Sequence, residues 1–272
     1  MDNLIYKLNN LYYSYLGKIP ALSGVSMEIK SGQKICVIGA NGSGKSTLLQ
    51  ILDGLIFPDT GEVKFGQQVL NEKKFQDDKF CQEFRRKVGF VFQNPDVQLF
   101  CPTVEEDIVF GPLQLGFSKA EIKQRLDKLA YALELKDLLK RLPHQLSIGE
   151  KRKVAIASVL IIQPEVIILD EPTAGLDPLT SRRIIDILIE ENAKGKTIIT
   201  ATHDLHIVEE ISDLVYVFNN QKTIIRFGQP SVVLNDNALL ESNNLVHIHS
   251  HKHKDKVHVH PHLHLDHHAG EH

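Results

Sequence analysis

The sequence predicts an α/β fold, in which a mainly parallel sheet has helices on both faces, antiparallel β strands lie at the N-terminus and a helical subdomain is inserted. Short apolar runs typical of buried strands recur along the chain, and helical segments separate many of them. A glycine-rich loop joins one of these runs to a helix. From residue 95 to 162 the pattern is helical, which predicts the insertion.

The composition is that of an ordinary soluble chain that is long enough to bury a core. Of 272 residues, 42% are hydrophobic and 24% are charged, and the formal net charge is −3. This charge gives no electrostatic case for nucleic acid as a partner. The 3 cysteines are scattered, as in a reducing compartment, and we see neither a signal peptide nor an apolar run of about 18 residues. Any membrane role must therefore come through partners.

Two β-type runs, at residues 11–15 and 25–29, open the chain, and turn residues separate them. Their aromatic residues include Tyr12, Tyr13 and Tyr15. A tyrosine here could pack on a sheet face or stack on a nucleotide base. Spacing alone leaves both interpretations open.

A phosphate-binding loop follows the apolar strand predicted at residues 34–38 and precedes a helix predicted at 46–55. Glycines let the backbone bend around a phosphate and point its N–H groups inward. Lys45 can reach the β- and γ-phosphates, the Ser46 hydroxyl can bind Mg²⁺, and the helix N-terminus favours an anion. A glycine-rich turn before an ordinary helix is the alternative. The loop consists of Gly39, Ala40, Asn41, Gly42, Ser43, Gly44, Lys45, Ser46 and Thr47.

Two capping boxes mark helix starts in the helical part of the chain, at Ser118-x-x-Glu121 and Ser147-x-x-Glu150. Behind the first box, apolar residues recur at helical spacing up to residue 133. The second box opens a helix that Pro164 ends.

A buried strand at residues 166–170 runs into two acids, Asp170 and Glu171. Paired carboxylates at a nucleotide site usually bind Mg²⁺ and activate water. A further strand at 197–201 leads to His203, and the runs 215–218 and 223–227 predict a closing hairpin.

Residues 243–272 form a histidine-rich tail that holds most of the 14 histidines and too few apolar residues for a core. We therefore expect disorder in the absence of a ligand. Imidazole suits nickel and cobalt, and the i, i+2 spacing places rings on one side of an extended chain. A solvated linker is the alternative, and interruptions such as Asp266 argue against a purification artefact. The predicted Ni²⁺ or Co²⁺ ligands are His247, His249, His251, His253, His258, His260, His262 and His264.

Six short strings occur in one order and together resemble the nucleotide-binding subunit of ATP-binding-cassette transporters. The resemblance covers about residues 4–230 and rests on the loop 39–47, Gln93, and the strings at 146–150, 169–171, 174–177 and 202–204. The narrower string from residue 92 to 112 is similar to the energy-coupling-factor class, in particular to its cobalt/nickel uptake ATPases.

The resemblance implies a P-loop NTPase core of the RecA-like type. Residues 1–94 and 155–240 would form this nucleotide-binding core, and residues 95–154 would form a helical signature subdomain. The tail 243–272 would stand outside both.

The resemblance also implies a role for each matching residue at the bound ATP. Residues 39–47 would hold the phosphates, with Lys45 taking part in catalysis. Asp170 would hold Mg²⁺ together with Ser46, and Glu171 would be the general base. Gln93 would touch Mg²⁺ and His203 would contact the γ-phosphate. Tyr15 matches the adenine-stacking position best.

A second ATPase subunit, identical or different, is implied as a partner in catalysis. Ser147 and Gly149 would bind the γ-phosphate held by that subunit, and Asp177 would line the contact between the two. A serine at a helix N-terminus is more often a cap, and a capped N-terminus is also an anion site. Ile148 and Lys153 stand where the family usually has glycine and arginine, which predicts a weaker trans site.

The implied function is that of the ATP-hydrolysing subunit of an importer of cobalt or nickel. It would sit peripherally on the cytoplasmic face of the membrane, with an integral-membrane coupling subunit and a substrate-binding membrane subunit. A vitamin-uptake transporter with an accessory metal-binding tail, a soluble metal store or chaperone, and a nucleic-acid ATPase of the same superfamily are the alternatives. A soluble metal store or chaperone would not need the catalytic set Asp170, Glu171 and His203. The lack of a basic extension argues against a nucleic-acid ATPase.

Overall fold

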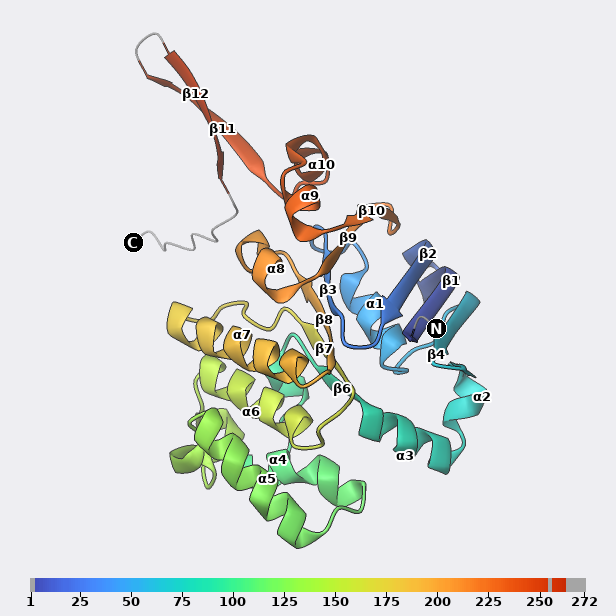
Figure 1. The fold of residues 1–272 in the computed structure, drawn as a ribbon, viewed down its shortest axis with the longest axis vertical. Coiled ribbons are helices and arrows are strands. Elements are labelled where there is room, and N and C mark those ends of the chain that lie inside the picture. Colours follow the sequence, from blue (N-terminus) through green and yellow to red (C-terminus); the bar gives the residue numbers. More distant parts are fainter. Residues whose placement is uncertain (1–2, 254–255, 263–272) are drawn as a thin grey trace.

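An antiparallel sheet forms the N-terminal part of the computed structural model, which describes residues 3–253 and 256–262 (Figure 1). Its strand order is β2-β1-β4-β5. Both long strands extend beyond the runs predicted from the sequence: Tyr6 and Leu8 are also buried on β1, and Ala21 and Leu22 are buried on β2. The strands are β1 Leu4–Tyr15, β2 Ile19–Lys30, β4 Thr60–Phe65 and β5 Gln68–Val69.

A six-stranded sheet, in the order β10-β9-β3-β8-β7-β6, forms the centre of the fold. The five strands from β9 to β6 pair in parallel, and β10 pairs antiparallel with β9 as the predicted closing hairpin. The predicted α/β class with a mainly parallel sheet is therefore confirmed. The strands are β3 Lys34–Ile38, β6 Val88–Val91, β7 Val166–Asp170, β8 Thr197–Thr202, β9 Leu214–Phe218 and β10 Ile224–Gly228.

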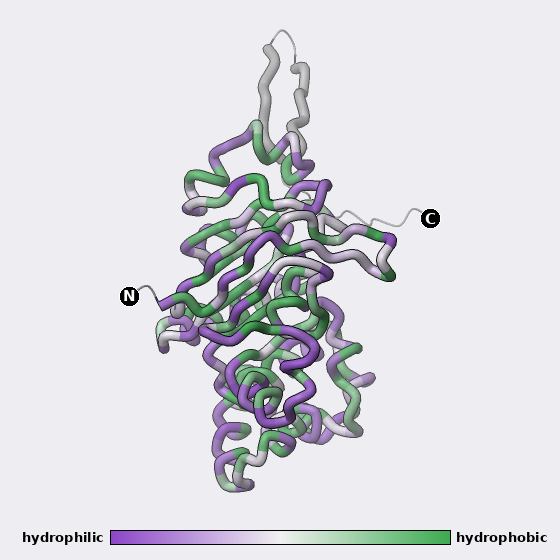
Figure 2. Tube along the Cα trace, turned by 90° about the vertical axis from the view of Figure 1, so that its right-hand side faces the viewer, coloured by the Kyte–Doolittle hydropathy of each residue, from purple (hydrophilic) through white to green (hydrophobic). Residues whose placement is uncertain are grey.

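Both faces of the central sheet are buried, each in a different hydrophobic core. Helix α1 Lys45–Leu52 and the antiparallel sheet pack in the core that contains Ile168 of β7. The neighbouring Ile167 and Leu169 lie in the core of the helical subdomain. This alternation follows from the period of two along a strand. Figure 2 shows apolar and polar stretches along the chain.

The inserted helical subdomain consists mainly of α4 Val104–Gln114, α5 Lys119–Ala132 and α6 Ile148–Leu160, together with short 3₁₀ turns (Figure 1). Ser147 and Glu150 make both hydrogen bonds of the predicted capping box. Ser118 also caps its helix, but the Glu121 carboxylate pairs with Arg125 instead of returning a bond to the cap. Helix α6 continues across the expected boundary between residues 154 and 155, so core and subdomain share it.

Residues 71–87, where charged side chains are frequent, form α2 Glu72–Phe75 and α3 Asp78–Lys87. The side chain of Phe84 is fully buried there and contacts Phe65 and Phe75. Aromatic residues spaced among charges allow one face of α3 to join the core.

Four further helices lie in the C-terminal part of the chain, after β7. They are α7 Pro178–Ala193, α8 Leu205–Ile211, α9 Pro230–Leu234 and α10 Asn237–Ser242. A third core joins α8, α9 and α10 to the central sheet and includes Leu245 and Val246. The folded part therefore extends to Val246, beyond the end of the core expected at residue 240. Across the described residues, no helix combines the length and apolarity needed to cross a membrane.

Part of the histidine-rich tail pairs as two antiparallel strands, β11 His247–His253 and β12 Lys256–His262. The register places His249 opposite His260 and His251 opposite His258. This backbone pairing differs from the disorder expected for residues 243–272, because every second residue of the tail can occupy one face of a strand. The predicted ligand His264 lies outside the described residues.

Candidate nucleotide-binding site

A cavity of about 410 Å³, here called the nucleotide cavity, lies at the carboxyl ends of β3 and β7. It brings together most of the residues predicted to bind ATP and Mg²⁺. Gly39 and Ala40 lie at the base of the loop and His203 lies beside Glu171, outside the lining. The predicted residues that line it are Tyr15, Asn41, Gly42, Ser43, Gly44, Lys45, Ser46, Thr47, Gln93, Asp170 and Glu171.

The loop requires glycine at the two conserved positions of the phosphate-binding pattern for steric reasons. Gly44 has a φ of +107°, and a Cβ atom there would lie 2.3 Å from the carbonyl oxygen of Ala21. A Cβ atom on Gly39 would lie 2.6 Å from the Ser43 hydroxyl and 2.9 Å from the Phe218 carbonyl. Contacts below 3 Å are not tolerated, so the loop can fold this closely only with glycine.

Lys45 is buried, and the loop itself holds its ammonium group. The Nζ atom donates to the carbonyl oxygens of Gly39 at 2.7 Å and Ala40 at 3.3 Å. Burial lowers the pKa of Lys45 from its ordinary value, and the carboxylates of Glu171 and Asp170 oppose that shift. A phosphate entering the cavity would replace carbonyl acceptors by charged ones, which form stronger hydrogen bonds with a cation.

The carboxylate of Asp170 ends β7 and is 5% exposed. Its Oδ1 atom has no hydrogen-bond partner. Burial raises the pKa of Asp170, and a hydrogen bond with Ser46 lowers it. A carboxylate oxygen without a partner, a hydroxyl and the amide of Gln93 in one cavity fit Mg²⁺, which takes oxygen ligands.

Among the residues that line the nucleotide cavity, only Asp170 and Glu171 are acidic. Where the structure describes side chains, no group of three or more His, Cys, Asp or Glu gathers. Mg²⁺ commonly binds through one or two carboxylates together with substrate phosphates and waters. The residues present therefore suit a cation that enters together with a nucleotide.

Glu171 is buried and held by the end of the neighbouring strand β8. Its Oε1 atom lies 2.8 Å from Nδ1 of His203, and its Oε2 atom accepts from the Thr202 hydroxyl at 3.1 Å. The contact with Glu171 raises the pKa of His203, and burial opposes it. Glu171 also has a φ of +49°, in the left-handed region that side chains rarely adopt. A buried carboxylate on a strained backbone between two partners is held in a fixed position.

Tyr15 contacts the loop through its hydroxyl, which lies 3.1 Å from the Thr47 hydroxyl. Its side chain is partly exposed at the mouth of the nucleotide cavity, whereas Tyr13 packs against the core. The rings of Tyr13 and Tyr15 meet edge to face at 5.1 Å. Of the tyrosines named from the sequence, Tyr15 is thus the one that lines the cavity.

Four residues of the cavity lining are absent from the sequence prediction: Ile19, Pro20, Ala21 and Lys222. Lys222 lies in the turn between β9 and β10, and its Nζ atom donates to the carbonyl oxygen of Gly42. No local pattern marks these residues, because they approach the loop from the start of β2 and from a turn far along the chain.

Ser147, Gly149 and Asp177 line a separate cavity of about 190 Å³, here called the signature cavity. The Ser147 hydroxyl accepts from the Glu150 N–H, and the Asp177 carboxylate accepts from the Thr180 N–H and hydroxyl. Ile148 and Lys153 also line it, and the Ile148 side chain is 49% exposed. Within one chain, therefore, these predicted ATP-binding residues do not join the other set.

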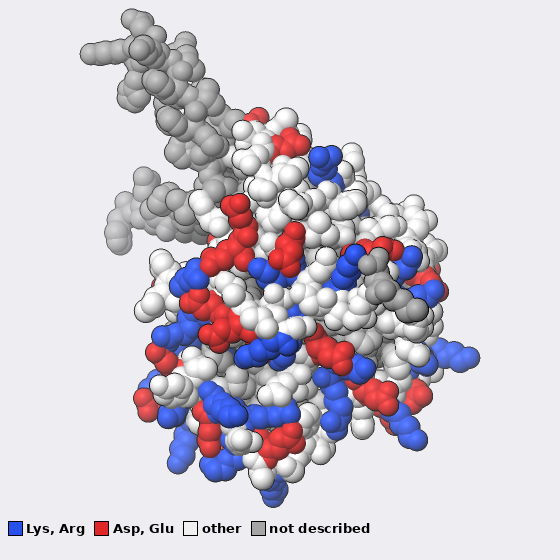
Figure 3. All heavy atoms as spheres, in the orientation of Figure 1, with Lys and Arg blue, Asp and Glu red and all other residues white. Residues whose placement is uncertain are grey.

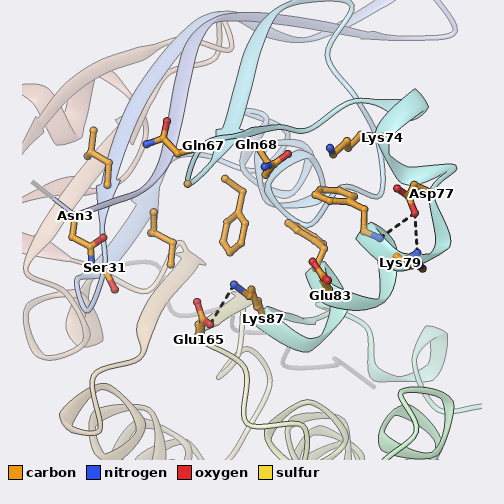
Figure 4. Close-up of a pocket in the computed structure, with 16 residues that line it drawn as sticks. Asn3, Ser31, Gln67, Gln68, Lys74, Asp77, Lys79, Glu83, Lys87 and Glu165 are labelled. Carbon is orange, nitrogen blue, oxygen red and sulfur yellow. Dashed lines mark hydrogen bonds and ion pairs between the residues drawn. The ribbon is translucent and has the colours of Figure 1, made fainter.

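A larger cavity, of about 540 Å³, lies elsewhere (Figure 4). Its walls include Phe65, Phe84, Lys79 and the ion pair between Lys87 and Glu165. None of the residues predicted to bind ATP or Mg²⁺ lines it. Cavity size therefore does not locate the functional site. The hydrogen-bond partners of the polar groups in the nucleotide cavity locate it instead.

The profile of the ABC transporter family matches residues 22–174. The nickel import ATP-binding protein NikO of Rhodobacter capsulatus is 44% identical, over 89% of this chain and 95% of its own. The energy-coupling factor transporter ATP-binding protein EcfA of Methanocaldococcus jannaschii is 42% identical, over 89% and 85%. A solved dimeric ATP-binding cassette in a post-hydrolysis state, bound to ADP and Pi, matches with a TM-score of 0.75 and 31% identity, over 83% of this chain and 98% of that one.

The fold, the nucleotide cavity and these similarities define an ATP-hydrolysing cassette. This chain belongs to the ABC transporter family as an ATP-binding ATPase subunit. The resemblance to the family and to its energy-coupling-factor class, predicted from the sequence, is confirmed.

Proposed function

We propose that this chain is the ATPase of an energy-coupling-factor importer of a transition-metal cation, nickel or cobalt. The observation that supports its catalytic part is the arrangement of Lys45, Asp170 and Glu171 at one edge of the central sheet, with His203 fixed on Glu171. The similarity to a nickel import protein supports the metal. A peripheral position on the cytoplasmic face of the membrane, below a coupling subunit and a substrate-binding subunit, follows from this assignment.

ATP would enter through the open side of the nucleotide cavity, where Tyr15 offers a partly exposed ring for stacking on adenine. Loop residues 39–47 would surround the phosphates with backbone N–H groups. Lys45 would exchange the carbonyls of Gly39 and Ala40 for the β- and γ-phosphate oxygens. Asp170, Ser46 and Gln93 would hold Mg²⁺, which neutralises charge on the phosphates when bound.

Glu171 would act as the general base. Its carboxylate would accept the proton of the attacking water while the water oxygen bonds to the γ-phosphorus and the bond from the γ-phosphorus to the bridging oxygen breaks, with ADP as the leaving group. The Nδ1–H group of His203 would donate to Oε1, because an ionised carboxylate only accepts, and the Thr202 hydroxyl donates to Oε2, so the carboxylate keeps one orientation during this step. His203 would also contact the γ-phosphate once ATP is bound.

The chain would work as a dimer, homo- or heteromeric. The signature cavity holds Ser147, Gly149 and Asp177 apart from the chain's own nucleotide cavity, so these groups can reach ATP only on another subunit. The similarity to a dimeric cassette bound to ADP and Pi supports this arrangement. The half-exposed Ile148 would stand at the dimer contact and weaken the trans site.

An apolar patch on the helical subdomain would contact the membrane subunit. Val97 and Phe100, which follow Gln93 in the chain, are 63% and 66% exposed, and Phe110 and Leu113 of α4 are also exposed. The rings of Phe100 and Phe110 meet edge to face at 5.0 Å. Exposed aromatic clusters of this kind mark interaction sites. On the face shown in Figure 3, acidic and basic side chains are mixed, which supports a protein partner and not nucleic acid.

The transport assignment is tested by metal uptake in cells that lack this chain. We expect uptake of nickel or cobalt to return with the wild-type chain and not with Glu171→Gln. If neither metal depends on the chain while ATP hydrolysis persists, another substrate is transported, with the vitamin-uptake class first to be tried. If metal is retained equally by the Glu171→Gln cells, the chain stores the metal.

The tail would bind Ni²⁺ or Co²⁺ through the histidines at 247–264. Calorimetry can compare the full chain with a chain that ends at Val246, which keeps the third core. We expect metal uptake by the full chain alone, and weaker uptake below about pH 6.5 as the imidazoles protonate. Equal uptake by both chains would disprove a metal site in the tail.

A further inference from the structure

Arg152 is a buried cation whose partners are backbone carbonyls. It lies on α6 and is 2% exposed. Its guanidinium donates to the carbonyl oxygen of Phe92 at 2.7 Å and to that of Gln93 at 2.5 Å. Its Nε atom is buried without a partner. Burying a guanidinium in this way is costly, and the nearby carboxylates of Asp170 and Glu171 offset part of that cost.

The backbone of Phe92 is held from both sides. Its carbonyl accepts from Arg152, and its N–H donates to Oε1 of Gln98 at 3.1 Å. The Nε2 atom of the same glutamine donates to the Ala155 carbonyl on α6 at 2.9 Å. Arg152 and Gln98 therefore fasten the segment after β6 to one turn of α6.

The segment after β6 and the N-terminus of α6 contribute to two different cavities. Gln93 lines the nucleotide cavity, and Ser147, the N-cap of α6, lines the signature cavity. Arg152 lies little more than one turn beyond Ser147, on the same helix. A shift of Gln93 toward bound nucleotide would thus be transmitted to the N-terminus of α6, because a hydrogen-bonded helix moves as a rigid element.

We propose that Arg152, supported by Gln98, is a positioning residue that couples the two ATP sites of the dimer. It ties the backbone at Gln93, in a chain's own nucleotide cavity, to the helix that presents Ser147 to the other subunit's ATP. The coupling rests on the proposed role of Gln93 and on the proposed dimer, and it assigns Arg152 no contact with ATP.

The variant Arg152→Met tests this coupling, with Arg125→Met as its matched control. The Arg125 guanidinium also donates to two backbone carbonyls of this region, those of Ile161 and Ile162, at 2.8 and 3.1 Å, away from both cavities. We expect Arg152→Met to lower kcat about tenfold with a change in KM below about threefold, and Arg125→Met to change kcat less than about twofold. An equal loss of kcat in the two variants would overturn the proposal.

Two further variants cover the case in which Arg152→Met does not fold. Arg152→Lys keeps the charge but loses the paired donors, so we expect kcat between wild type and Arg152→Met. Gln98→Met should lower kcat in the same direction with a similar KM. If both variants hydrolyse ATP at the wild-type rate, the coupling does not exist.

Hydrogen exchange separates this proposal from the role of Gln93. Arg152→Met and Gln98→Met should speed exchange of backbone amides at residues 92–98, and Arg125→Met should not. Gln93→Ala tests the glutamine itself. If it keeps the wild-type kcat, the role of Gln93 fails, while unchanged exchange at 92–98 in Arg152→Met would refute the tether.

Discussion

The nucleotide cavity and the signature cavity differ in how their polar groups are satisfied. In the nucleotide cavity, Oδ1 of Asp170 has no partner and Lys45 bonds only to carbonyls of its own loop. In the signature cavity, Ser147 and Asp177 complete their hydrogen bonds with neighbours on their own helices. The nucleotide cavity therefore has polar groups that charged groups of a ligand can satisfy. In the signature cavity, the corresponding groups already cap the N-termini of two helices.

This difference indicates where binding free energy is gained. Buried polar groups that lack hydrogen-bond partners contribute most to the binding free energy when a ligand supplies those partners. Groups that already cap helices contribute less to the binding free energy. The signature cavity should therefore add to ATP binding only when it meets the ATP of a second subunit. The predictions below test this division, from the largest expected effect to the smallest.

Replacement of the base should separate binding from hydrolysis in the nucleotide cavity. We expect Glu171→Gln to lower kcat by about a hundredfold or more, because a positioned base contributes about 10²–10⁴ in rate. ATP affinity should stay near the wild-type value, since the proposed role of Glu171 is toward the attacking water and the loop residues 39–47 are unchanged. Phosphate release with nucleotide binding as the control measures both. Hydrolysis at the wild-type rate would remove Glu171 from this role.

Loss of the serine hydroxyl should affect the signature cavity only in the dimer. We expect Ser147→Ala to lower ATPase activity about tenfold, the effect of one lost transition-state contact, without changing ATP binding to the monomer. Ser118→Ala is the matched control, because Ser118 caps α5 in the same way. Each variant should lose about 1 kcal/mol of folding stability from its cap. Equal ATPase activities in the two variants would reduce Ser147 to a cap.

Lys222, in the turn between β9 and β10, should stabilise the loop of the nucleotide cavity. We expect Lys222→Met to weaken ATP binding about threefold, because one hydrogen bond to the Gly42 carbonyl is lost. The exposed Lys140→Met makes the same change in net charge. Titration with a fluorescent ATP analogue can compare the two variants. An equal change in both would mean that only net charge matters.

The pair of Glu171 and His203 should make stability depend on pH. Because the pKa of His203 is raised in the folded state, the pair stabilises the fold below the unfolded pKa of about 6.5. This contribution disappears as the pH rises through the folded pKa. Urea denaturation should therefore show a larger difference between wild type and Glu171→Gln at pH 6 than at pH 9. For Thr202→Val, which removes no charge, the difference from wild type should be independent of pH.

The local elements of this fold were predictable because their patterns lie within a few residues. The loop 39–47, the strand β7 and the cap at Ser147 were all located from sequence and lie as predicted. Helix α3 was missed, since its buried face rests on aromatic residues such as Phe84 among charged ones. The pairing of β11 with β12 was missed as well, because composition alone suggested disorder.

The amino-acid sequence by itself determined which groups are candidates for the chemistry: a glycine loop with its lysine, two acids at a strand end and a histidine after the next strand. Only the tertiary structure decided that Lys222 closes on the loop, that Arg152 holds the backbone at Gln93, and that Ser147 stands in a cavity apart. Those contacts join backbone atoms to side chains far along the chain. A carbonyl oxygen is the same in every residue, so no sequence pattern shows which one a distant side chain will bind.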